Sequence, residues 1–97
     1  MIQFLIRRDD AEWFDLSSAC YTEVLRPRII PSRPVEGWGS HRIEVDGAEV
    51  SFSDEDPGFQ VVFETGNIDA KRARQIVDEI SQNIEAQTGQ KTRVVEL

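Results

Sequence analysis

The segment from residue 41 to residue 64 constrains the fold of this chain more than any other part of it. Two runs in which apolar and polar residues alternate, 41–45 and 48–52, are separated by the dipeptide Asp46-Gly47. This pattern indicates a β-hairpin, because the type I′ turn that joins such strands needs a positive φ at both central positions. One face of the hairpin is expected in the core, since successive side chains of a strand point to opposite sides. Its apolar residues are Ile43, Val45, Val50 and Phe52.

A third strand and a long helix are expected to follow this hairpin. After a turn, the apolar run 59–64 completes a three-stranded meander. From 69 to 88 the apolar residues fall at helical spacing on one narrow stripe, and Gly89 stands where the residue after a helix C-terminus belongs. Either Asn67 or Asp69 can cap the start of this helix. The stripe consists of Ala73, Ile76, Val77, Ile80 and Ile84.

The two ends of the chain predict two further strands, at 1–8 and 91–97; the first is a short apolar run with β-branched and aromatic residues, ended by two arginines. Between residues 11 and 25 the apolar residues fall at helical spacing, and Asp9 or Asp10 could cap such a helix. Serine, threonine and tyrosine in the same stretch favour an extended segment instead. The helix is the favoured interpretation, and the extended segment stays open as its alternative.

Residues 26–40 predict a long connection. This stretch holds Pro27, Pro31 and Pro34, and each proline removes a backbone donor and biases the residue before it away from helical geometry. The pair Ile29-Ile30 is expected to attach the connection to the core.

Together these elements predict a single α+β domain over residues 1–97, with the order β-α-β-β-β-α-β. Its sheet is expected to be mainly antiparallel, with about five strands and both helices on one face. At the level of architecture this arrangement resembles a ferredoxin-like sandwich with one additional strand. A resemblance of this kind carries no function, and no specific residues identify a family.

Composition argues against several classes of function. The 97 residues include eleven basic and eighteen acidic ones, which gives a formal net charge of −7. This balance argues against direct binding to nucleic acid or to an anionic membrane, since both attract Lys and Arg. The sequence shows no signal peptide, no apolar stretch long enough to span a membrane, and a single cysteine. We therefore expect a soluble cytoplasmic protein.

Catalysis and metal binding find little support in the sequence. His41 is the only base with an ordinary pKa near neutrality, and no spacing pairs it with Cys20, which lies on the apolar stripe of 11–25. One His and one Cys cannot complete a zinc site. The acidic run 54–56 lacks the spacing of a calcium loop and is expected to be a solvated turn. We expect no metal, no cofactor and no catalytic residue.

The charge is segregated along the chain. Residues 43–64 hold seven acids and no Lys or Arg, whereas the other 75 residues carry eleven charges of each sign. Residues 26–42, directly before this segment, hold four arginines and one glutamate. In one interpretation, the favoured one, the arginine-rich connection folds back over the acidic sheet face. In the other, the acidic face docks a basic partner and steers its approach.

These observations favour a small binding module whose partner is another protein, of basic character in the charge-steered case. Inhibitor and immunity proteins are one class of such modules. Trp38, between two glycines, is either a plug on the sheet, which is the commoner use of such a ring, or an exposed anchor for the partner. Trp13 is expected in the core. The residues expected to bind are Arg28, Arg33, Trp38 and Arg42 on the basic side, with Glu44, Glu49 and Asp54 opposite.

Three alternatives stay open. The protein could bind a small molecule, or act as a small enzyme, through a pocket near His41. It could have a mainly structural role as a homodimer, pairing through an exposed edge such as 93–97. The connection 26–34 has a Pro-x-x-Pro spacing with flanking arginines, which is typical of polyproline II ligands.

Overall fold

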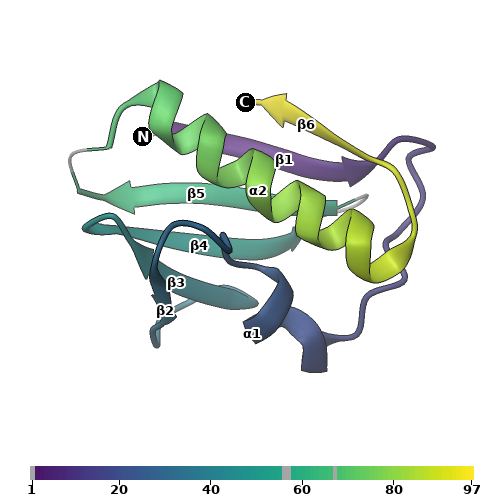
Figure 1. Cartoon of the computed structure of the whole chain (residues 1–97), viewed down its shortest axis with the longest axis horizontal. Coiled ribbons are helices and arrows are strands. Elements are labelled where there is room, and N and C mark those ends of the chain that lie inside the picture. Colours follow the sequence, from purple (N-terminus) through teal and green to yellow (C-terminus); the bar gives the residue numbers. More distant parts are fainter. Residues whose placement is uncertain (1, 56–57, 67) are drawn as a thin grey trace.

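One antiparallel sheet of six strands organises the molecule in the computed structural model, which describes residues 2–55, 58–66 and 68–97 (Figure 1). The strand order is β2-β3-β4-β5-β1-β6, and each neighbouring pair is antiparallel. The strands are β1 (Ile2–Arg8), β2 (Ser32–Pro34), β3 (His41–Val45), β4 (Ala48–Glu55), β5 (Gly58–Thr65) and β6 (Thr92–Glu96). The predicted α+β class with an antiparallel sheet is confirmed.

The predicted strand count and element order are not matched exactly. A short strand, β2, lies inside the connection 26–40 and pairs with β3 at the edge of the sheet. Its Pro34 is tolerated there because an edge strand needs hydrogen bonds on one side only. The ferredoxin-like pattern with one additional strand is therefore not matched exactly either.

The predicted hairpin is confirmed in its turn and its inner face. Asp46 and Gly47 have φ values of 56° and 77°, the two positive angles that the Asp-Gly sequence predicts. The four apolar residues of the inner face are at most 1% exposed. Of the following acidic run, Asp54 and Glu55 end β4, while Asp56 lies outside the described residues.

The long helix α2 (Ala70–Thr88) forms as predicted. Asp69 caps it by accepting a hydrogen bond from the Arg72 backbone N–H at 2.7 Å, while Asn67 lies outside the described residues. Gly89 ends it in the left-handed region, with φ at 71°. All five residues of the predicted stripe are fully buried against the sheet.

The helix predicted over 11–25 is wrong for its first seven residues. Helical structure is confined to the short 3-10 turn η1 (Ser18–Cys20) and to α1 (Tyr21–Val24). Ser17, rather than Asp9 or Asp10, caps η1, and its hydroxyl accepts from the Ala19 N–H.

Two predicted burials in this region are corrected, because a turn stands where the helix was expected to begin. A turn follows β1, in which the Ala11 N–H donates to the Arg8 carbonyl and Ala11 has a φ of 65°. Trp13, expected in the core, is 49% exposed. Cys20 is only half-buried, although it packs against the core.

The core fills the space between the sheet and the two helices. Figure 1 shows α1 and α2 on the same side of the sheet, with α2 running diagonally across the strands. The connection after α1 contributes Ile30, which is 6% exposed, whereas its neighbour Ile29 is 86% exposed. The prediction for this pair is thus correct for one residue and wrong for the other.

Candidate functional site

The side of the sheet that faces away from the helices carries the candidate site. Neither α1 nor α2 covers it (Figure 1), and it is formed by the side chains that alternate with the core positions along each strand. We call it the open face. Its residues are Gln3, Leu5, Arg7, Arg33, Arg42, Glu44, Glu49, Ser51, Ser53, Glu55, Gln60, Val62, Glu64, Arg93 and Val95.

Arg42 lies at the centre of an ion-pair cluster on the open face. Its Nε is 3.2 Å from a carboxylate oxygen of Glu49, and its Nη2 is 2.7 Å from one of Glu64. The Ser51 hydroxyl donates to the other Glu64 oxygen at 3.1 Å. The Arg42 side chain is only 10% exposed, which is unusual for an arginine on an uncovered face.

Hydrogen bonding keeps both members of the central pair charged. The hydrogen bond from Arg42 lowers the pKa of Glu64, against the opposing effect of burial. In return, the hydrogen bond to Glu64 raises the pKa of Arg42. The pair is therefore a fixed element of the sheet at neutral pH.

Trp38 lies over this cluster. The centroid of its ring is 5.8 Å from the guanidinium carbon of Arg42, within reach of a cation–π interaction. The chain passes so close to Arg42 that a Cβ added to Gly37 would overlap the Arg42 side chain. The other side of the indole faces solvent, since Trp38 is 60% exposed. Trp38 therefore covers Arg42 and leaves most of its side chain exposed, while its role as an anchor for a partner stays a prediction.

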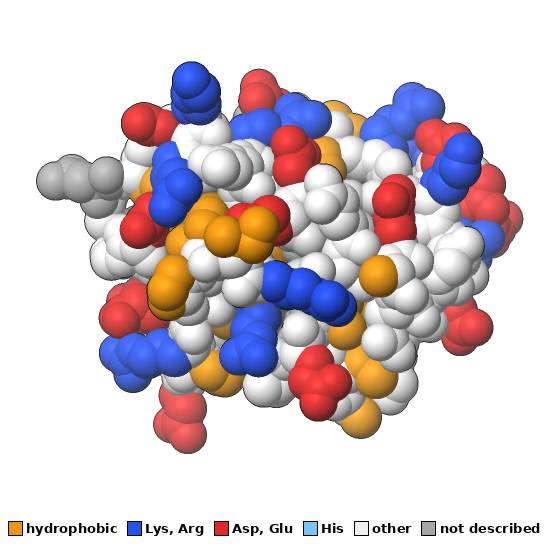
Figure 2. Space-filling model, viewed as in Figure 1, with side chains coloured by type: hydrophobic (Ala, Val, Ile, Leu, Met, Phe, Trp, Pro, Cys, Tyr) orange, Lys and Arg blue, Asp and Glu red, His pale blue; other side chains and the backbone are white. Residues whose placement is uncertain are grey.

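Further acidic residues of 43–64 form ion pairs with arginines from other elements. Arg33 on β2 pairs with Glu44 at 3.1 Å, and Arg72 on α2 pairs with Asp46 at 2.7 Å. The open face holds four arginines and four glutamates among the described residues, so it is not uniformly acidic. On the helix side, Figure 2 shows charged side chains of both signs interspersed. The segregation along the sequence is thus partly cancelled in space, since Glu44, Asp46, Glu49 and Glu64 pair with arginines.

The structure brings together five of the seven residues that the sequence analysis selected. The open face carries Arg33, Arg42, Glu44 and Glu49, with Trp38 above them. Arg28 and Asp54 lie elsewhere.

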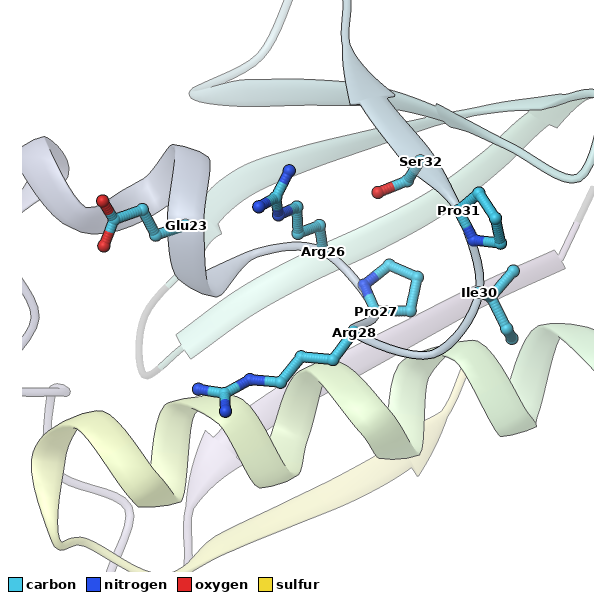
Figure 3. Close-up of a pocket in the computed structure, with 7 residues that line it drawn as sticks. All are labelled: Glu23, Arg26, Pro27, Arg28, Ile30, Pro31 and Ser32. Carbon is cyan, nitrogen blue, oxygen red and sulfur yellow. The ribbon is translucent and has the colours of Figure 1, made fainter.

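Asp54 and Arg28 both belong to the helix side of the sheet. The Tyr21 hydroxyl of α1 donates to an Asp54 oxygen at 3.2 Å, and burial together with this carboxylate raises the pKa of Tyr21. Arg28 lies in the connection after α1, beside α2 (Figure 3).

Sequence reasoning missed two residues of the cluster. Glu64 could have been selected from its alternation with Val62 on the outer side of a predicted strand. No local signal marks Gly37, because its role depends on the approach of Arg42 from another part of the chain. Close packing between distant segments is invisible in a single sequence.

His41, the centre of the enzyme alternative, is not part of this cluster. Alternation along β3 places it on the helix side, where its ring centroid is 5.8 Å from that of Phe52. Burial lowers the pKa of its imidazole, and Nε2 is buried with no hydrogen-bond partner among the described residues. The surroundings of the ring therefore favour its neutral form.

Comparisons with known proteins add no assignment. The chain matches no family model, no curated protein and no solved structure. Within the described ranges, no helix is long and apolar enough to cross a membrane. The same residues contain no group of three or more acidic, His or Cys side chains placed to hold a metal ion.

Proposed function

We propose that this protein is a binding module that docks another protein on its open face, with Trp38 as the anchor. The observation that carries the proposal is the state of Trp38, which is 60% exposed although its ring rests on a nearly buried arginine. Tryptophan and arginine are the residues most often found at the energetic centre of protein interfaces.

The anchor is held in place before any partner arrives. Ion pairs with Glu49 and Glu64 restrain the Arg42 side chain, so that its guanidinium stays in position under the indole ring. Two backbone hydrogen bonds fix the segment around Trp38, from the Val35 N–H to the Arg42 carbonyl and from the Ser40 N–H to the Phe52 carbonyl. A surface ordered in advance loses less conformational entropy on binding, which favours affinity.

The charges of the open face favour a partner whose surface is complementary to the Trp38 side chain. They do not favour a basic partner attracted only by the acidic residues of this face. Glu44, Glu49 and Glu64 already pair with arginines of this chain. Their field is therefore partly cancelled, which reduces long-range steering of a basic protein. A partner with an apolar recess for the indole and a polar rim fits this face.

Trp38→Ala tests the proposal, with Trp13→Ala as the matched control. Both tryptophans are about half exposed, but Trp13 lies in the loop after β1 and outside the cluster. Affinity capture with the parent protein identifies the partner, which is then purified and titrated. We expect the partner to bind Trp38→Ala at least about 30-fold more weakly than the parent protein. Trp13→Ala should bind normally, and both variants should keep the melting temperature of the parent protein.

Two results would contradict the proposal. One is a set of captured proteins that is identical for the parent protein and for Trp38→Ala. The other is a large fall in the melting temperature of Trp38→Ala, which would identify the ring as a structural plug.

A further inference from the structure

The tip of the connection between α1 and β2, formed by Arg28 and Ile29, is exposed on the helix side of the molecule. It borders a hollow of about 500 Å³ (Figure 3). The residues that line the hollow are Glu23, Arg26, Pro27, Arg28, Ile30, Pro31 and Ser32. The carboxylate of Glu23 turns away from the hollow in this view.

Ile29 stands at this tip and is 86% exposed, the highest value among the large apolar side chains that the structure describes as exposed. Its backbone is nevertheless anchored to α2, since the Ile29 N–H donates to a Glu79 carboxylate oxygen at 3.2 Å. The Asn83 side chain also donates to the Arg26 carbonyl at 2.6 Å. Pro27 and Ile30 are buried on either side of the tip. The exposed side chain is thus presented on a backbone with little freedom.

Two arginines that closely precede Ile29 in the chain have no counter-ion among the described residues. Arg26 and Arg28 take part in no ion pair there, whereas six other arginines of the chain do so. In Figure 3 the Arg26 guanidinium lies between Glu23 and Ser32, and the Arg28 side chain extends along α2. Among the described residues, two unpaired cations thus lie within three positions of an exposed apolar side chain, in a chain with a net charge of −7.

We propose that this tip is a second recognition surface, which binds an acidic peptide segment of a partner protein. In this arrangement an apolar side chain of the segment packs on Ile29, while its carboxylates pair with Arg26 and Arg28. Guanidinium groups bind carboxylates through paired, charge-assisted hydrogen bonds. Because the whole chain is acidic, its long-range field does not attract such a segment. Recognition must therefore depend on short-range contacts with the tip.

A randomised peptide display library, selected against the intact protein at near-physiological salt, supplies the probe. We expect the selected peptides to carry several Asp or Glu residues around one apolar residue. Their binding, measured by fluorescence anisotropy, should weaken at least about tenfold in Ile29→Ser and in the double variant Arg26→Gln/Arg28→Gln. Both variants should keep the parent melting temperature, because the altered side chains are exposed.

Two control variants separate the tip from other effects. Lys71→Gln removes a positive charge from an exposed residue of α2 outside the hollow and should leave peptide binding unchanged. Trp38→Ala should also leave it unchanged, because Trp38 lies over the other face of the sheet. A result that contradicts the proposal for the tip is thereby distinguishable from one that contradicts the proposal for the open face.

Several results would overturn this inference. These are the absence of any selected peptide, the selection of peptides without acidic residues, and equal weakening by Lys71→Gln. Binding of the parent protein to phosphatidylserine vesicles that is lost in Ile29→Ser would assign the tip to a membrane surface instead.

Discussion

At the scale of single residues, Arg42 has the largest structural role among the selected residues. Its stem lies against Gly37, its guanidinium pairs with two glutamates, and its outer face is covered by Trp38. Arg33, by contrast, forms one ion pair in which both side chains are substantially exposed. The two arginines appear equivalent in the sequence but differ in burial, and burial decides what an ion pair contributes.

We predict that Arg42→Met lowers the free energy of unfolding by about 2–3 kcal/mol, because Glu64 is then left nearly buried without its cation. Arg33→Met should change it by less than about 0.5 kcal/mol, since the Arg33–Glu44 pair is solvent-exposed. Urea denaturation of the three proteins measures both effects. Equal losses for the two variants would show that the burial of Arg42 has no energetic consequence.

His41 predicts a dependence of stability on pH. Burial lowers its pKa in the folded state below the ordinary value of 6.5, so the unfolded chain binds the proton more readily. The stabilising effect of the neutral ring is complete above pH 6.5 and is lost as the pH falls through the folded-state pKa. His41→Gln should flatten the decline in stability between about pH 7 and pH 5. Melting temperatures of both proteins across this range test the prediction, and parallel curves would contradict it.

At the scale of elements, the contact between β5 and β1 depends on the first residue of β5. A Cβ added to Gly58 would overlap the backbone carbonyl oxygen of Ile6 on β1. The two strands pair over six positions in the centre of the sheet, so neither backbone can move away freely. At Gly89, after α2, a Cβ would meet no other atom, so this position favours glycine only because of its positive φ.

Gly58→Ala is therefore expected to lower the free energy of unfolding by about 3 kcal/mol, because a backbone clash cannot be relieved by a side-chain rotation. Gly89→Ala should cost only about 1 kcal/mol, the conformational strain of a left-handed alanine. Chemical denaturation of the two variants provides the comparison. A smaller loss for Gly58→Ala than for Gly89→Ala would show that the strands separate easily at this point.

At the scale of the whole molecule, one hydrophobic core joins nearly every element. Its buried residues come from β1, α1, the connection after α1, β3, β4, β5 and α2. Contacts shared in this way favour a single cooperative unfolding transition in a domain of 97 residues.

During urea unfolding, far-ultraviolet circular dichroism monitors the loss of α2, and fluorescence monitors Trp38 on the open face. We expect the two changes to coincide. A Trp13→Phe variant removes the signal of the other tryptophan, so that Trp38 is the only reporter. Identical midpoints in urea are the expected outcome. Separate midpoints would indicate that the open face and its loop unfold independently of the core.

The elements with a strong local pattern were predictable from the sequence. The hairpin follows from alternation and from Asp46-Gly47, and α2 follows from its apolar stripe and the caps Asp69 and Gly89. In both cases the decisive interactions join residues close together in the chain. The residues of the open face were partly predictable for the same reason, since alternation places Glu44 and Glu49 outside.

Tertiary structure alone decided the remainder, because the interactions involved join distant segments. The turn after β1 leaves Trp13 exposed, although its spacing predicts a buried helical position. The pairing of β2 with β3 places Arg33 beside Glu44 and thereby converts part of the charge segregation into an ion pair. The sequence determined where the acidic charge lies along the chain. Only the folded sheet decided that Arg42 neutralises part of it and carries Trp38, because that contact requires residues 37, 42, 49 and 64 to meet in space.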